Sequence, residues 1–280
     1  MANILFLKVT NARERHFGYQ YVDGLNVLPT KEEFSTDPNV EIRHYYVEDE
    51  TDTNEPKYGG YGLWMPGFHF TTAKFIHKFY TYGCYLRVVS FPKNNPDFKM
   101  TMNPYKDSFR ANMIILGEKY SLNDLATYAK FNIPLPSIYT AVTQNLMTVV
   151  KHLVENNSCT TDQLDKALIL ATGHKKYDVA RYLVANKADV RYLGAESLWH
   201  SIQYGDLKTV KKLVEKGTDI KLDILDYVKH CVNHMQWKIL KYLLIKCNDV
   251  TVNDYAIACI ENKGYFIVAR HLKKILAQKN

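Results

Sequence analysis

The chain has 280 residues, of which 46% are hydrophobic and 23% are charged, a mix typical of soluble globular proteins. No run of about 18 uninterrupted apolar residues occurs, so no membrane-spanning helix is predicted. The opening stretch "MANILFLKVTNARER" reaches Lys8 too early for a signal peptide. We therefore expect no membrane association, and we expect the protein to stay in the compartment where it is made.

The formal net charge is +7, and it is distributed unevenly along the chain. Residues 1–120 are balanced, whereas residues 121–280 carry 22 Lys and Arg against 15 Asp and Glu. This surplus favours an acidic protein partner, although Lys also serves simply to solvate the outer faces of helices. The absence of a basic-aromatic motif, and of any cluster of five Lys or Arg, argues against nucleic acid.

The five cysteines are widely spaced, with no CxxC pair and no histidine at zinc-finger spacing. They are Cys84, Cys159, Cys231, Cys247 and Cys259. We expect them to be reduced thiols that fill space in a cytosolic protein, and we predict no metal site and no cofactor.

Residues 1–120 are predicted to form a compact α+β domain. Segments 2–10, 68–72 and 84–92 have the composition and alternation of strands, and a helix is expected over 73–83. The acidic, glycine-rich segment "EDETDTNEPKYGGYG" (48–62) has no apolar period and is predicted to be a long loop.

Two histidines are candidate catalytic residues in this domain. The order "GFHFTT", helix, "CYLRVVSFP" resembles the strand, helix and strand of ADP-ribosyltransferases, which need a His or Arg to seat the nicotinamide half of NAD. His16 and His69 would be available for that role, but no acidic residue has a distinguishing context. The alternative, which we favour, is that the rings and histidines of this region form a hydrophobic core.

A thirty-residue period marks the second half. The stretches "DVARYLVANKADV" and "KTVKKLVEKGTDI" begin at residues 178 and 208. Leucines recur at matching places, the last one residue short of the period: Leu153, Leu183, Leu213, Leu243 and Leu272. The positions six, four and three before and one after each leucine are apolar, except at Thr209 and Lys273. These offsets trace one stripe of an α-helix.

A second apolar segment precedes each of these helices. The five segments are 137–144, 162–173, 196–205, 224–233 and 254–263. Because neither helix of a pair can bury its stripe alone, about five pairs are predicted to stack into a solenoid over residues 121–280. A helix at 122–130 would cap its N-terminal end. The acids that follow the second helices, Asp189, Asp219 and Asp249, suit turn geometry.

The candidate binding residues of the solenoid are rings on the first helices or in the turns after them. They are Trp199, His200, Tyr204, His230 and His234. Partly exposed rings bury much area for little lost entropy, which favours a contact patch around Trp199 and Tyr204. The alternative is that the histidines are ordinary polar surface residues.

The repeats resemble the ankyrin repeat, specifically the thirty-residue variety found in giant viruses of amoebae (the mimivirus-like family). "DVARYLVANKADV" and "DLKTVKKLVEKGTDI" carry the resemblance, over roughly 135–272, although the ankyrin "TPLHxA" opening is missing. The first half resembles the N-terminal domain of the same proteins through "KVTNARERHFGYQYVDGLNVL" (8–28), "PGFHFTT" (66–72), "YGCYLRVVSFPKNNPDFK" (82–99) and "FRANMIILGEKYSL" (109–122). It departs from them in the insertion before Pro66 and in His69, where they tend to have Tyr.

We predict a non-enzymatic protein that binds a host or viral partner along the concave face and loops of its repeats. Two alternatives remain open. The first is an ADP-ribosyltransferase-like or other enzymatic N-terminal domain that the repeats deliver to a target, and the second is a structural component of the virion. The expected location is the host cytoplasm, or the particle in the last case.

Overall fold

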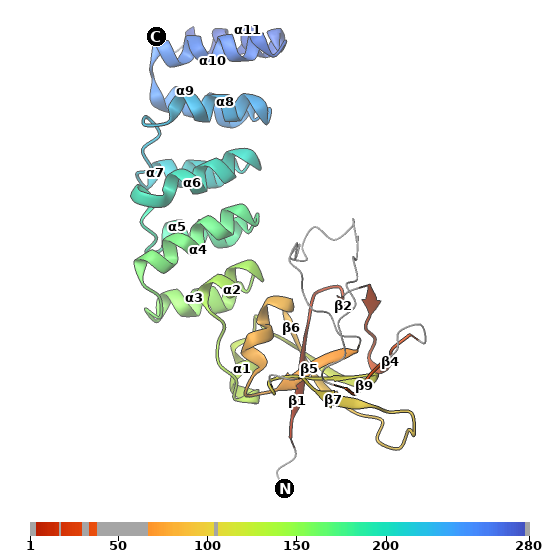
Figure 1. Cartoon of the computed structure of the whole chain (residues 1–280). Coiled ribbons are helices and arrows are strands. Elements are labelled where there is room, and N and C mark those ends of the chain that lie inside the picture. The colour runs from red at the N-terminus through yellow and green to blue at the C-terminus, as the bar shows by residue number, and fades with distance from the viewer. Residues whose placement is uncertain (1–3, 17, 30–33, 38–66, 104–105, 278–280) are drawn as a thin grey trace. The chain divides into compact units, whose positions relative to one another are not determined.

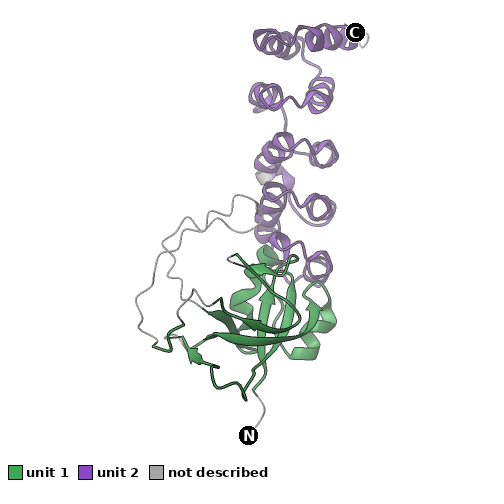
Figure 2. Cartoon of the chain, turned by 90° about the vertical axis from the view of Figure 1, so that its right-hand side faces the viewer, with its two compact units in different colours: residues 1–140 green, residues 141–280 purple. Residues whose placement is uncertain are grey.

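The computed structural model describes residues 4–16, 18–29, 34–37, 67–103 and 106–277. The chain divides into two compact units, residues 1–140 and 141–280 (Figure 2). A strand-rich unit followed by helical repeats confirms the predicted fold class. The expected boundary after residue 120 falls at the end of the last strand of the first unit. The predicted loop at 48–62 lies outside the described residues.

The first unit is built on a seven-stranded sheet in which the described pairings are antiparallel. Its strand order is β4-β9-β6-β1-β5-β8-β7, which places β1 at the centre (Figure 1). The strands are β1 (Phe6–Thr10), β4 (Gly24–Val27), β5 (Phe68–Thr72), β6 (Tyr85–Ser90), β7 (Met100–Met102), β8 (Phe109–Ala111) and β9 (Met113–Ser121). A separate ribbon pairs β2 (Arg15–His16) with β3 (Tyr19–Gln20).

Aromatic rings form the core on one face of the sheet. Phe6 on β1 makes edge contacts with Phe70 on β5 and Phe109 on β8, with centroids 5.5 and 5.2 Å apart. Such geometry suits the ring quadrupoles and adds to the hydrophobic gain. Because side chains alternate along a strand, Lys8 lies on the same face of β1 as Phe6. A lysine therefore stands next to an aromatic core in the central strand.

The helix expected at 73–83 is not an α-helix. A 3₁₀-helix, η1 (Ile76–Tyr82), forms instead, and its N-terminus has no side-chain cap. A seven-residue segment rich in rings, and with no cap, gains too little from α-helical hydrogen bonds to offset the cost of nucleation. The tighter helix still buries Ile76 and Tyr80 against the sheet unit.

The second unit consists of stacked helix pairs (Figure 1). The first helices are α2 (Ile138–Thr143), α4 (Thr161–Gly173), α6 (Val190–Gln203), α8 (Ile224–Asn233) and α10 (Val250–Asn262). The second helices are α3 (Met147–Glu155), α5 (Tyr177–Ala185), α7 (Leu207–Glu215), α9 (Trp237–Cys247) and α11 (Phe266–Ala277). A helix also forms at the predicted capping position, α1 (Leu125–Phe131), and belongs to the first unit.

The recurring leucines all point into the helical core, as the period predicts. Leu183, Leu213 and Leu243 are fully buried, and Leu153 and Leu272 are less than a tenth exposed. From α4 onward the first helices pack on one another in one layer and the second helices in another (Figure 2). The repeats are therefore stacked units, each of which buries its apolar stripe against its neighbours.

Polar contacts tie the α4–α5 pair to the α6–α7 pair. The carboxylate of Asp165 on α4 accepts a hydrogen bond from the backbone N–H of Asp189, at 2.7 Å. Arg181 on α5 donates to both carboxylate oxygens of Asp206, at 3.1 and 3.3 Å. Asp206 in turn caps α7 by accepting from the N–H of Thr209. Asp189 and Asp249 cap α6 and α10, so turn geometry accounts for both of these acids.

The turn between the two helices of a pair contains a residue in the left-handed region. It is Lys175 in one repeat, Gly205 in the next and Met235 in the one after, thirty residues apart, with φ values of 57°, 76° and 55°. Gly264 occupies the corresponding place in the last repeat. Glycine adopts this conformation without strain, whereas Lys and Met do so at a cost.

Within the described residues, every helix is too short or too polar to reach across a lipid bilayer.

Candidate functional site

Rings from two neighbouring first helices form a cluster on the helical unit. Trp199 on α6 lies edge-on to His230 on α8, with ring centroids 4.1 Å apart. His230 in turn contacts His234, at 4.5 Å, and Tyr227 lies 5.8 Å from Trp199. Trp199, His230 and His234 are each partly exposed. We call Trp199, His230 and His234 the ring cluster.

The other two candidate residues lie beside the cluster on α6 and face the preceding repeat. The Nδ1 atom of His200 is 3.4 Å from the hydroxyl of Thr172, and its ring covers Gly173. Tyr204 ends α6, and the ammonium of Lys175 lies 4.4 Å from the centre of its ring. The structure thus brings three of the five candidates into ring contact, with His200 and Tyr204 on the same helix as Trp199 or at its end.

Burial favours the neutral form of His230. Desolvation lowers the pKa of His230, and the neighbouring imidazoles of His234 and His200 lower it further, against a hydrogen bond to the backbone of Trp199. A neutral imidazole beside an indole is an amphipathic surface with hydrogen-bonding capacity. In the described part of the chain, no three His, Cys, Asp or Glu side chains are placed to hold a metal ion.

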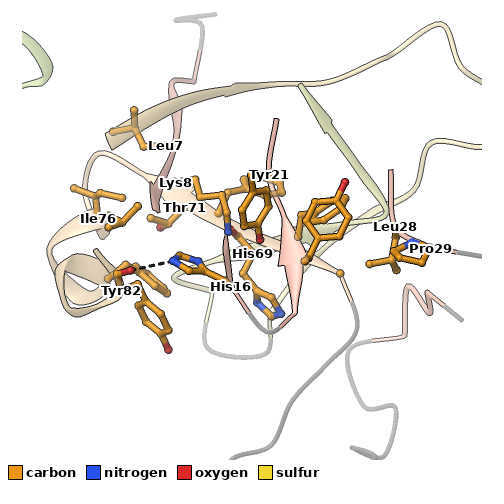
Figure 3. Close-up of a pocket in the computed structure, with 16 residues that line it drawn as sticks. Leu7, Lys8, His16, Tyr21, Leu28, Pro29, His69, Thr71, Ile76 and Tyr82 are labelled. Carbon is orange, nitrogen blue, oxygen red and sulfur yellow. Dashed lines mark hydrogen bonds between the residues drawn. The ribbon is translucent and has the colours of Figure 1, made fainter. Parts of the chain in front are cut away.

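The first unit contains a cavity of about 290 Å³ between β1, β5, η1 and the β2–β3 ribbon (Figure 3). Its wall includes both histidines that the sequence singled out, His16 and His69. The other lining residues are Leu7, Lys8, Val9, Tyr19, Tyr21, Leu28, Pro29, Gly67, Phe68, Phe70, Thr71, Ile76, Phe79 and Tyr82. The structure thus joins the two histidines in one place, but surrounds them mainly with rings and aliphatic groups.

His16 is held in a fixed orientation. Its Nε2 lies 3.0 Å from the carbonyl oxygen of Tyr82 and 3.3 Å from the backbone N of Asn11. Burial, and then the nearby charge of Lys8, lower the pKa of His16 to about 3, so the ring is neutral at physiological pH. The Nε2 atom thus lies between an acceptor, the Tyr82 carbonyl oxygen, and a donor, the Asn11 N–H. Such a ring is suited to hydrogen bonding.

Lys8 is a residue of this cavity that the sequence prediction missed. Its side chain is 6% exposed, its Nζ donates to the carbonyl oxygen of His69 at 2.9 Å, and it lies 4.7 Å from the ring centre of Tyr21. Burial lowers its pKa to about 7, against the attraction of Glu14. A charged residue within the apolar run "ILFLKV" was the available signal, because a run of this kind is typical of a strand buried on both faces.

Comparison with known proteins identifies the family. Residues 138–224 match the family model for ankyrin repeats in three copies. Protein R868 of Acanthamoeba polyphaga mimivirus, named as an ankyrin repeat protein, is 31% identical over 191 residues, which are 65% of this chain and 83% of that protein. The chain belongs to the mimivirus ankyrin-repeat proteins.

Two further relatives come from the same virus. Protein R869 is 41% identical over 125 residues, 44% of this chain and 72% of its own length, and its name assigns no function. The ankyrin repeat protein L284 is 26% identical over 261 residues, 89% of this chain and 64% of its own length. No solved structure matches the chain.

The ring cluster extends beyond the repeats that the family model matches. Trp199, His200 and Tyr204 lie within residues 138–224, whereas His230 and His234 lie in the following repeat. That repeat has the same helix pair, α8 and α9, and the same left-handed turn residue at Met235. The ankyrin-repeat array of this chain therefore continues past the matched segment.

Proposed function

We propose that this ankyrin-repeat protein binds a protein partner through the ring cluster and the adjoining His200 and Tyr204. The observation that carries the proposal is the contact of Trp199, His230 and His234 across two neighbouring repeats, with each ring partly exposed. Aromatic side chains gathered at one place are typical of the residues that dominate binding energy. Ankyrin repeats are in general protein-interaction modules, which agrees with this role.

The partner is expected to carry an acidic surface. The net charge of +7 lies entirely in residues 121–280, and complementary charge accelerates association more than it strengthens the final complex. Binding should therefore weaken as salt rises toward physiological strength. Capture that is indifferent to salt would instead point to contacts made by the rings alone.

The test compares capture from an amoebal lysate by the full-length protein and by two tryptophan variants. Trp199→Ala removes the centre of the ring cluster and should reduce recovery of the partner about tenfold or more. Trp237→Ala removes an equally large, partly buried ring from a second helix, where it packs on Tyr265. Equal recovery by both variants would refute the assignment of the binding surface.

The enzymatic alternative is favoured by one observation, the presence of His16 and His69 on the wall of the same cavity. As a second proposal, the first unit transfers ADP-ribose from NAD to a nucleophilic side chain of a target delivered by the repeats, with release of nicotinamide. Labelled NAD incubated with the protein and cell extract should then label a protein, and His16→Ala or His69→Ala should abolish the label. The absence of label with the unaltered protein would refute this proposal.

Both proposals place the protein in the host cytoplasm, where amoebal partners are available. A structural role in the particle is the remaining alternative. Mass spectrometry of purified virions would detect the protein at stoichiometric amounts in that case, and only in traces if it acts in the cytoplasm.

A further inference from the structure

Lys8 is a buried base without a counter-ion. No carboxylate among the described residues comes within ion-pair distance of its ammonium. Its contacts are the carbonyl oxygen of His69 and the ring of Tyr21, which satisfy only part of the donor capacity of an ammonium. A charge with so little compensation is destabilising, and such charges are typical of ligand sites.

The nearest acid is already committed to other bases. The carboxylate of Glu14 lies 3.3 Å from the buried guanidinium of Arg87 and 3.7 Å from the ammonium of Lys119. Arg87 is also paired with Asp23. Glu14 therefore acts on Lys8 only from a distance, and Lys8 is one of the residues that line the cavity.

We propose that the cavity of the first unit binds a small organic anion. Lys8 would pair with the acidic group of this ligand, and the surrounding rings would pack against its apolar part. This proposal concerns residues of the first unit alone, so it does not depend on partner binding by the repeats or on the transferase alternative. In Figure 3, Lys8 lies beside Tyr21 and His69, on one side of the cavity.

The size and lining of the cavity define the ligand class. A volume of about 290 Å³ lies at the lower end of the range for small-molecule sites, so it suits a compact acid better than a dinucleotide. Phe68 and Phe70 are nearly fully buried, and Tyr19 packs on Phe68 with centroids 4.7 Å apart. A ligand with an aromatic or branched aliphatic part would pack against these rings. Neutral His16 adds a hydrogen-bonding group without a competing charge.

Binding should be coupled to proton uptake. Without ligand, Lys8 has a pKa of about 7 and is largely neutral at pH 8. A bound carboxylate or phosphate favours the ammonium and raises that pKa, so binding at pH 8 takes up a proton. The other titratable groups around Lys8 are His16, Tyr19, Tyr21, His69 and Tyr82 on the cavity wall and Glu14 outside it. Of these, His16, Tyr19 and Tyr21 stay neutral at this pH, since burial shifts their pKa values away from it.

The experiment measures binding of phenylacetate, phenyl phosphate and the neutral analogue phenylacetamide to the full chain by calorimetry. At least one anion should bind about tenfold more tightly than the amide, and the preferred anion distinguishes a carboxylate site from a phosphate site. Titration at pH 8 in two buffers of different ionisation enthalpy should show uptake of about one proton. Lys8→Met, which keeps an unbranched side chain, should remove both the preference and the proton uptake.

The matched control is Lys93→Met, which removes an exposed lysine from the same unit and should bind like the unaltered protein. Circular dichroism of Lys8→Met establishes that the variant is folded, and folding is expected because the substitution removes a buried charge. Three results would overturn the proposal. They are equal affinity for anion and amide, undiminished anion binding by folded Lys8→Met, and no binding of either anion.

Discussion

At the scale of single residues, the buried base in the central strand makes the stability of the first unit depend on pH. The pKa of Lys8 is about 7 in the folded protein and 10.5 in the unfolded chain. Between these values the unfolded chain binds more protons than the folded one, so this residue makes the protein less stable as pH falls from 10 toward 7.

Lys8→Met should remove that dependence. At pH 7 the variant is expected to be more stable than the unaltered protein, and the difference should shrink by up to about 1.4 kcal/mol per pH unit as pH rises toward 10. Urea unfolding of both proteins across this range provides the measurement. A constant difference between them would show that Lys8 is charged and compensated in the folded state.

His16 should likewise make the protein less stable as the pH falls, but in the acid range. Its pKa is about 3 when folded and 6.5 when unfolded, so its contribution to stability is complete above pH 6.5 and is lost as pH falls toward 3. His16→Gln retains hydrogen-bonding capacity but does not titrate, and should flatten the stability profile between these limits. A profile unchanged by the substitution would mean that other groups control acid unfolding of this unit.

At the scale of elements, the turns between paired helices keep the same left-handed conformation although the residue at that position varies from repeat to repeat. The turn conformation is kept at Lys175 and Met235 even though glycine has been lost there. The packing of the neighbouring helices holds this conformation in spite of its local cost.

Restoring glycine should therefore stabilise the array. Met235 is more than half exposed, so Met235→Gly loses little burial and relieves the backbone, with an expected gain of about 0.5–1 kcal/mol. The reverse change, Gly264→Ala, meets no atom within 4 Å, and should cost about 1 kcal/mol through backbone strain alone. Chemical denaturation followed by circular dichroism would measure both. Opposite signs are required, because the first variant removes a Cβ atom from a left-handed position and the second introduces one.

At the scale of the whole molecule, each of the two compact units has its own core. Leu243→Ala removes a fully buried side chain from α9 and should destabilise the helical unit by about 2–5 kcal/mol. Hydrogen exchange should show faster opening in α8 to α11, with unchanged protection in β1 and β6. A matching loss of protection in the sheet would show that the two units unfold as one.

The sequence predicted the repeats better than the sheet unit. A period of thirty residues repeats one physical requirement several times, so chance variation at single positions such as Thr209 does not hide it. Thr209 is itself fully buried, and its hydroxyl bonds to Asp206, which explains how a polar residue occupies an apolar position. In contrast, the sheet unit depends on pairings between distant segments, and no local pattern places β1 between β5 and β6.

The candidate site on the repeats was likewise easier to predict than the one in the sheet unit. The ring cluster was predictable because Trp199 and His230 occupy related places in neighbouring repeats, and the stacking brings them together. The cavity was predicted only in part. His16 and His69 were noticed as residue types, whereas Lys8 became significant once β1 was known to be the central strand, buried on both faces.

The contacts that join consecutive helix pairs imply a mechanical behaviour. Each helix pair packs mainly on the pair before it and the pair after it, so a pull on the C-terminal end would load one seam at a time. Each pair that peels away would release thirty residues of chain, about 100 Å when extended. Under tension the array would therefore lengthen in steps of equal size, one helix pair at a time, and it would refold when the tension is released.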